Sequence, residues 1–202
     1  MEHRRRSNEA GFDAESQAPG GVATNADRLT QRLAAQFTEE PELIRAYVQD
    51  AEVTSPQRAQ LVLAAAQMAV AAQPEYADLR YYASEVAIRA GDCDLAATLL
   101  EQALRINPRY KDALILAGRV ALRRERPAAA KTYLQAALAV GADYPDVHML
   151  IGDVWRERED WGQARESYTR ALKLNDSLTS ARDALAALPA TDETGKHDEL
   201  PA

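Results

Sequence analysis

The sequence predicts an all-α solenoid, in which similar pairs of helices stack along one axis. Three observations support this fold class. Ala and Leu dominate the apolar residues, whereas Phe and Trp occur only twice each, and both Ala and Leu favour helices. No segment alternates apolar and polar residues over the length of a strand. Side chains of one size class return every 34 residues, which is typical of stacked helical repeats.

Several columns of the sequence keep one residue class at this period. Small residues recur in two of them and large residues in a third, and an Ala-Leu pair recurs in a fourth: Ala96, Ala130 and Ala164; Ser84, Gly118 and Gly152; Leu100, Leu134 and Tyr168; and Ala103-Leu104, Ala137-Leu138 and Ala171-Leu172. A larger side chain cannot fit where two helices nearly touch. The small columns are therefore expected to mark the contacts between helices.

Both ends of the chain are predicted to be disordered tails. Residues 1–24 are rich in Gly, Ser, Asn and Glu, and residues 189–202 are short, polar and acidic. Neither segment has enough apolar side chains to offset the entropy lost on ordering.

The first ordered element is predicted to be an N-terminal helix over residues 25–40. Leu29, Leu33 and Phe37 recur on one face of this segment, as the helical period requires. That face is expected to pack against the rest of the chain.

Residues 41–76 are predicted to form a degenerate helix pair. A short first helix covers 41–53, and a long Ala- and Leu-rich second helix begins at Ser55-Pro56. Ser is a common N-cap, and Pro fits the first helical position because its missing N–H is not needed there.

Three regular helix pairs follow, and a short helix ends the array. The pairs are expected over 77–110, 111–144 and 145–178, and the capping helix over 179–188. In the first pair, Gly91-Asp92 separates the two helices and Asn107-Pro108 ends the second, because Gly suits the left-handed end of a helix and Pro cannot continue one.

A 34-residue helix–turn–helix with these columns resembles the tetratricopeptide repeat family, and the resemblance covers residues 77–178. The residues that carry it are Ala117-Gly118 and Ile151-Gly152 in first helices, the recurrent alanines of second helices, Pro108 and Trp161. Arg80 and His148 depart from a usually apolar column, and Ala142 and Asp176 replace the closing Pro. The resemblance implies a right-handed superhelix whose concave inner surface comes mainly from the first helices and binds part of another protein.

Ten residues on this inner surface are the candidate partner-binding residues. By the repeat register they are Tyr81, Glu85, Ile88, Ile115, Arg119, Leu122, Arg123, Met149, Asp153 and Arg156. The apolar members would suit an extended peptide or an amphipathic helix of a partner. Alternatively, part of this apolar stripe packs under neighbouring helices or under the chain's own helix at 25–37.

The charges of the inner surface also allow two interpretations. Across neighbouring repeats they alternate, as in Glu85, Arg119 and Asp153, which favours a ladder of surface ion pairs, each worth about 0–1 kcal/mol. Alternatively, Arg119 and Arg123, joined by Arg156, receive an acidic partner.

One binding mode known in the family is not expected here. Some relatives clamp a C-terminal carboxylate with Lys, Arg and Asn side chains on this surface. The corresponding columns of this chain hold Tyr81, Glu85, Leu116, Asp146 and Leu150.

No catalytic residues, metal site or cofactor are expected. The sequence contains no glycine-rich phosphate loop, HExxH or GxSxG motif. Cys93 is the only cysteine, and the three histidines lie far apart in the sequence. Trp155 and Trp161 are expected to belong to the core.

The charge distribution and the absence of targeting segments limit the partners. Residues 25–188 hold 20 basic and 23 acidic side chains, so the basic stripe typical of nucleic-acid binding is missing. No secretory signal and no apolar stretch long enough to span a membrane are found, so a cytoplasmic protein is expected. The predicted function is a scaffold or adaptor; the alternative is a homo-oligomer that self-associates through the array ends or the helix at 25–37.

Overall fold

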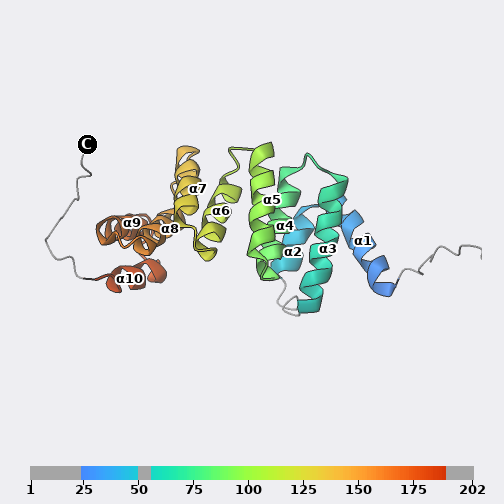
Figure 1. Ribbon diagram of the computed structural model, residues 1–202, viewed down its shortest axis with the longest axis horizontal. Coiled ribbons are helices and arrows are strands. Elements are labelled where there is room, and N and C mark those ends of the chain that lie inside the picture. The colour runs from blue at the N-terminus through green and yellow to red at the C-terminus, as the bar shows by residue number, and fades with distance from the viewer. Residues whose placement is uncertain (1–23, 50–55, 190–202) are drawn as a thin grey trace, which may run out of the picture.

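The computed structural model describes residues 24–49 and 56–189, and within these ranges the chain forms ten helices and no strand. The helices are α1 (Asn25–Glu39), α2 (Glu42–Gln49), α3 (Pro56–Ala72), α4 (Ala77–Arg89), α5 (Cys93–Ile106), α6 (Lys111–Arg123), α7 (Pro127–Ala139), α8 (Pro145–Glu157), α9 (Trp161–Leu174) and α10 (Thr179–Ala186). They form an elongated row with α1 at one end and α9 and α10 at the other, and α3 rather than α2 lies next to α1 (Figure 1). This arrangement confirms the predicted all-α solenoid.

The three regular pairs are α4–α5, α6–α7 and α8–α9. Their first helices begin at Ala77, Lys111 and Pro145, which are 34 residues apart. Within each pair the two helices pack closely, and each second helix also packs on the first helix of the next pair. Each pair therefore buries its apolar side against its neighbours, and isolated helices of this length would be marginal in water.

The turn inside each pair repeats one backbone conformation at the same period. Gly91, Glu125 and Glu159 all have positive φ, at 83°, 55° and 59°. The next residue in each turn donates its N–H to a carbonyl five residues back, as Asp92 does to Ala87 (2.9 Å), which is the Schellman end of a helix. Only the first of the three turns uses Gly, so two of them accept the cost of a left-handed non-glycine residue, about 1–2 kcal/mol.

The small columns mark close contacts between the helices of a pair, as expected. A Cβ added at Gly118 would lie 2.7 Å from Leu134 Cγ, and one added at Gly152 would lie 2.5 Å from Tyr168 Cδ1. Both distances are shorter than van der Waals contact, so only Gly allows these helices to approach so closely. Leu134 and Tyr168 are fully buried.

The N-terminal end of the row differs from the predicted helix pair over 41–76. α3 packs chiefly against α1, whereas α2 packs mainly against α4. The reason is the length of the available apolar face: α1 buries Leu33 and Phe37, but α2 has only eight residues. α1 thus takes the place of a first helix, and α3 packs directly on α4, while α2 lies to one side against α4.

The C-terminal end is covered by α10, which packs against α9. Leu188 lies in the same buried cluster as Ala164 and Tyr168. Beyond α10, an NH2 group of Arg165 donates to the carbonyl oxygen of Pro189 (2.9 Å). The two predicted tails, apart from Thr24 and Pro189, lie outside the described residues.

Candidate partner-binding surface

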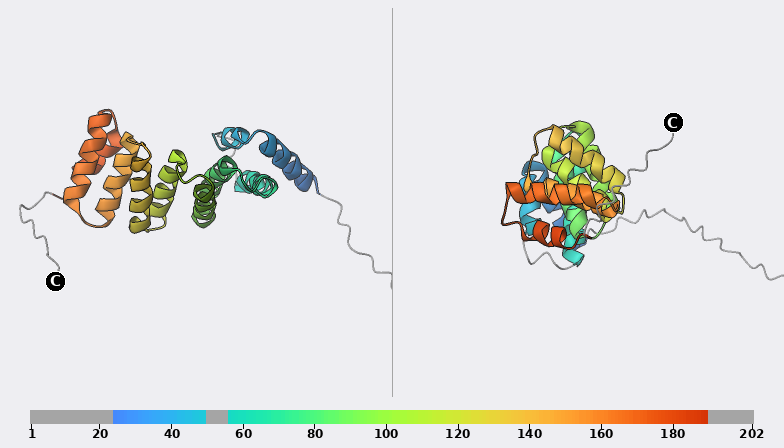
Figure 2. Two further views of the ribbon diagram at one scale, coloured as in Figure 1. Left: turned by 90° about the horizontal axis from the view of Figure 1, so that it is seen from above. Right: turned by 90° about the vertical axis from the view of Figure 1, so that its left-hand side faces the viewer.

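The candidate residues lie on α4, α6 and α8, which share one side of the row. α2 and α10 lie on this same side near its two ends (Figure 2, left). We call the surface formed by the ten candidate residues the inner surface. Its three parts, on α4, α6 and α8, differ in how far other helices of the chain cover them.

On α4 the inner surface is largely enclosed. The Tyr81 hydroxyl donates to Glu85 Oε1 (3.4 Å), and the Tyr81 ring lies 5.2 Å from the Tyr110 ring and 5.4 Å from the Tyr82 ring, centroid to centroid. Burial raises the pKa of the Glu85 carboxyl, while the positive charge of Arg45 on α2 lowers it by a smaller amount. The α4 part therefore faces α2 and Tyr110.

On α8 the inner surface is occupied by contacts within the chain. Ser180 of α10 donates its hydroxyl to Met149 Sδ (3.1 Å). Asp153 accepts from the Tyr168 hydroxyl (2.8 Å) and lies 3.6 Å from the Arg156 guanidinium. Burial raises the pKa of the Asp153 carboxyl, against the opposing effect of these two partners.

On α6 the inner surface is the most open. Arg119 and Arg123 are exposed, and Ile115 and Leu122 are half-buried. Neither arginine makes an ion pair with any residue that the structure describes. The α6 part thus combines two available positive charges with apolar side chains.

The predicted ladder of ion pairs across repeats is not formed. Asp153 is held by Tyr168 and by Arg156 of its own helix. Glu85 accepts a hydrogen bond from Tyr81, and Arg119 affects the Glu85 pKa only as a more distant charge. These acidic side chains therefore make their contacts within their own repeats. As a result, Arg119 and Arg123 of α6 have no ion-pair partner among the described residues.

The structure also decides which helices cover the apolar stripe. The helix at 25–37, considered from the sequence, packs on α3 instead. α2 covers the α4 end and α10 contacts Met149 at the α8 end. The middle of the stripe, at Ile115 and Leu122, remains partly exposed.

The two residues that depart from an apolar column both have polar partners. Buried Arg80 donates to Gln102 Oε1 and to the Tyr76 carbonyl, both at 3.2 Å. His148 Nε2 lies 2.6 Å from Asp143 Oδ1, and this contact holds the Asp143 pKa below its usual value.

Trp155 packs against the buried cluster that contains Ala164 and Tyr168, in line with the prediction, but part of its ring is also exposed. Two cations lie over its half-buried ring, with Lys131 Nζ 4.3 Å and the Arg158 guanidinium carbon 5.5 Å from the ring centroid. It lines a groove of about 650 Å³ between α7 and α9. Trp161 also packs against this buried cluster, as the sequence predicts.

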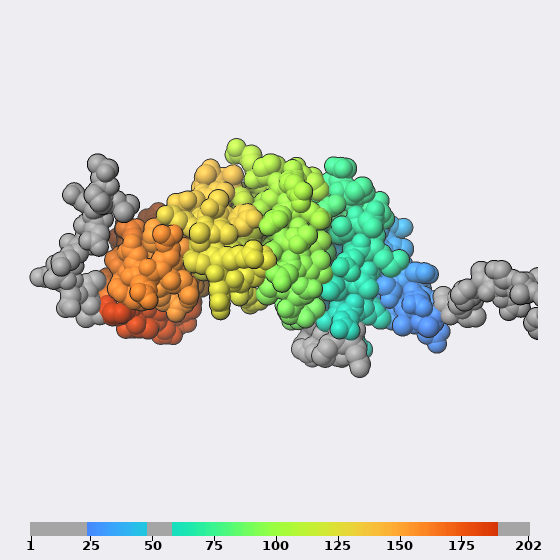
Figure 3. Space-filling view, in the orientation of Figure 1, coloured from blue at the N-terminus to red at the C-terminus, as the bar shows by residue number. Residues whose placement is uncertain are grey.

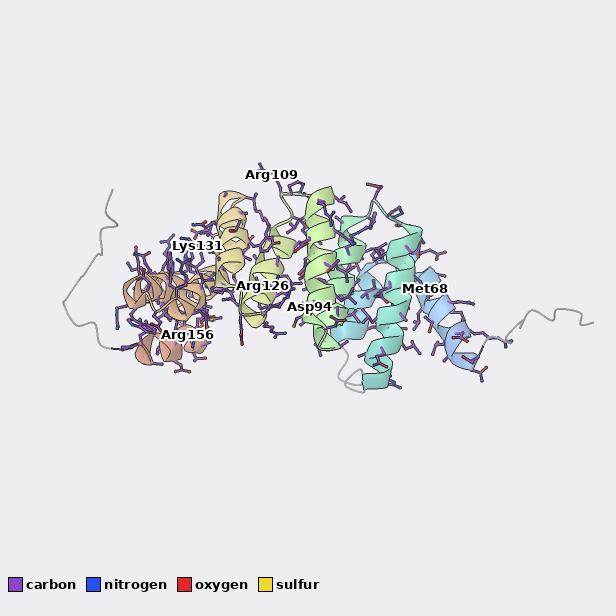
Figure 4. The ribbon with its side chains drawn as sticks, in the orientation of Figure 1. Met68, Asp94, Arg109, Arg126, Lys131 and Arg156 are labelled. Atoms are coloured by element: carbon purple, nitrogen blue, oxygen red, sulfur yellow. The ribbon has the colours of Figure 1, made fainter. Side chains whose placement is uncertain are left out.

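This groove, which we call the outer groove, lies away from the inner surface. Its lining comes from the exposed sides of α7, α8 and α9 and includes Leu138, Ile151 and Trp155. Lys131 and Arg156 lie on opposite sides of α8 (Figure 4). Sequence reasoning missed this groove, and the exposed Gly162 beside basic residues on α9 was the only available signal.

The described part of the chain, residues 24–49 and 56–189, contains ten helices. None of its helices is both long and apolar enough to cross a membrane. It holds no group of three or more His, Cys, Asp or Glu side chains placed to bind a metal ion.

Two models of the tetratricopeptide repeat match the sequence, one over residues 58–111 and one over residues 87–154. No curated protein matches it significantly. Together the two repeat matches extend from the beginning of α3 into α8.

Solved structures share the fold at low sequence identity. MamA of Desulfovibrio magneticus RS-1 (residue 41 to the end) has a TM-score of 0.62 and 15% identity over 81% of this chain and 84% of its own. YrrB, described as a TPR protein with an unusual peptide-binding site, has a TM-score of 0.57 and 19% identity over 77% and 81%. The first TPR of Spaghetti (RPAP3), bound to the HSP90 peptide SRMEEVD, has a TM-score of 0.53 and 17% identity over 55% and 87%.

Proposed function

Because this chain belongs to the tetratricopeptide repeat family, we propose that it is a protein-interaction scaffold whose inner surface binds an acidic, partly apolar segment of a partner. The observation that carries the proposal is the open α6 part of the inner surface. Arg119 and Arg123 are exposed and without an ion pair among the described residues, next to half-buried Ile115 and Leu122.

The position of these residues supports a short linear ligand. α2 covers the α4 part of the inner surface and α10 contacts its α8 part, so the open stretch lies between the two. An extended or helical segment that crosses α6 would place carboxylates on the arginines and an apolar side chain on Ile115 and Leu122. Charged pairs of this kind mainly give specificity and fast association, whereas the apolar contacts give affinity.

The structural neighbours support a peptide ligand in general terms. One is described as having a peptide-binding site, and another was solved with a peptide that contains three acidic residues. Recognition of a free carboxylate is not proposed, because Tyr81, Glu85 and Asp146 occupy columns where the carboxylate clamp of relatives has basic or amide side chains.

A peptide array provides the test. Twelve-residue peptides with systematically varied numbers of acidic and apolar residues are probed with the full-length wild type and with Arg119→Glu/Arg123→Glu. We expect the wild type to prefer peptides that carry both kinds of residue and the double variant to lose this preference. The matched control is Arg105→Glu/Arg109→Glu, which reverses two exposed arginines at the end of α5 and in the turn that follows.

The result that would overturn the proposal is equal binding of the same peptides by the wild type and Arg119→Glu/Arg123→Glu. Loss of binding in the control as well would show a general charge effect and would also contradict it. Self-association, the alternative function, is tested by light scattering over a concentration series. A constant monomer mass would exclude it.

A further inference from the structure

The outer groove has the composition of a binding site for an acidic segment. Its lining includes three permanently cationic side chains, Arg165, Arg170 and Lys173, and one acidic side chain, Glu166. Its floor is apolar, formed by Ile151 and Trp155 of α8. Such a cationic rim around an apolar floor fits a chain segment that carries several carboxylates.

The charges of the groove are only partly neutralised within the described residues. Asp143 pairs with Arg170 (3.1 Å) and also contacts His148 (2.6 Å). Lys173 makes no ion pair with the described residues. Arg165 donates to the carbonyl oxygen of Pro189 (2.9 Å) but pairs with no carboxylate among the described residues, so Arg165 and Lys173 carry positive charge that these residues do not neutralise.

Lys131 and Arg158 do not line the groove, but they add positive charge beside Trp155, which does. Both lie against the face of the Trp155 ring. A cation–π contact leaves the cation its full charge, because no opposite charge neutralises it. An acidic ligand in the groove would therefore meet positive charge along α9 and around Trp155.

One acidic segment of this chain begins at the edge of the groove. Arg165, which lines the groove, donates to the carbonyl oxygen of Pro189 (2.9 Å). Residues 190–202 follow immediately and contain Asp192, Glu193, Asp198 and Glu199 against one basic residue, Lys196. A segment of 13 residues can extend up to about 43 Å, whereas Arg165 and Lys173 are separated by only about 12 Å of helix.

We propose that residues 190–202 bind in the outer groove, where their carboxylates pair with the cationic rim of α9 and cover Trp155. The surrounding observations agree with this occupant: the site is cationic, the segment is acidic, and Pro189 is already held at the rim by Arg165. Attachment to the same chain keeps the segment at an effective concentration of about millimolar, so weak contacts suffice to fill the groove. Because exposed ion pairs are screened by salt, occupancy falls as ionic strength rises.

The test uses the full-length chain and neutralises the segment without changing its length. NMR spectra of the wild type are compared with those of Asp192→Asn/Glu193→Gln/Asp198→Asn/Glu199→Gln. We expect shifts of the Trp155 indole N–H and of the Gly162 and Lys173 amides, with no shift on α6. Raising NaCl from about 50 to about 500 mM should move the wild-type resonances to the positions of the variant.

The matched control neutralises the same number of acidic residues at the other end of the chain, as Glu2→Gln/Glu9→Gln/Asp13→Asn/Glu15→Gln. It should leave the groove resonances at their wild-type positions. A synthetic peptide of residues 190–202, added at millimolar concentration to the neutralised variant, should restore them. Identical groove resonances in the wild type and the neutralised variant would overturn the proposal, and so would shifts confined to α6, which would place the segment on the inner surface.

Discussion

At the scale of single residues, the packing of this array depends on positions where no side chain is tolerated. Gly118 and Gly152 each face a fully buried large residue of the paired helix. The buried Tyr168 ring lies against Gly152, and its hydroxyl donates to neighbouring Asp153. One small residue therefore permits both a helix contact and a hydrogen bond that holds an inner-surface carboxylate.

Gly152→Ala is expected to destabilise the protein by about 1–3 kcal/mol, because the new methyl group would overlap the Tyr168 ring and force it to move. Thermal unfolding measures this loss. The control is Gly162→Ala, where a Cβ meets only the Asp160 side chain at 3.7 Å, and where Ala favours the helix more than Gly does. Equal melting temperatures for the two variants would contradict the close contact.

Glu85→Gln is expected to raise the melting temperature at pH 7. Burial raises the pKa of Glu85, so the folded state prefers the neutral acid. The stability that this preference contributes is present below the unfolded pKa and is lost as the pH rises through the folded one. A neutral amide avoids that loss, so the difference between variant and wild type should shrink towards about pH 4. A difference that does not change with pH would refute this explanation.

At the scale of elements, the N-terminal helix is an integral part of the array. Phe37 of α1 is fully buried and its ring makes an edge contact with Tyr47 of α2, with centroids 5.5 Å apart. Gln73, directly after α3, donates to the Thr38 carbonyl (3.1 Å). α1 therefore connects the short α2 with the long α3 and closes the N-terminal end of the core.

Phe37→Ala is expected to reduce the free energy of unfolding by about 3–5 kcal/mol, the usual cost of deleting a buried aromatic ring. Chemical denaturation measures it. Leu29→Ala on the same helix provides the comparison, because Leu29 is 47% exposed and should lose much less. If both variants lost the same small amount, α1 would not be part of the folded array.

At the scale of the whole molecule, the array presents two separate surfaces that each combine positive charge with apolar side chains. The face formed by the second helices is directed towards the viewer in Figure 3, and the first helices lie on the other side of the row (Figure 2). Because each pair contacts only its neighbours along the row, such arrays gain stability pair by pair and keep long surfaces exposed. The ligands proposed for the inner surface and for the outer groove would therefore occupy different parts of the array.

The sequence by itself determined the helical fold, the 34-residue period and the small residues at helix contacts. These features follow from helix propensity and from side-chain size, and both can be read directly from the sequence. The column of Gly118 and Gly152 is the clearest case, because the period alone identified both positions as contacts and the structure confirms them.

Only the tertiary structure decided which helices pair at the N-terminus, which acidic groups are available and where the outer groove lies. α3 packs against α1 more than against the adjacent α2. Asp153 contacts Tyr168 and Arg156, and it makes no ion pair with Arg119. Each of these choices depends on the distance and burial of groups on different helices. A periodic sequence identifies the face of the helix on which a residue lies. The side chain that this residue contacts depends on how neighbouring helices tilt and on how much surface each of them buries.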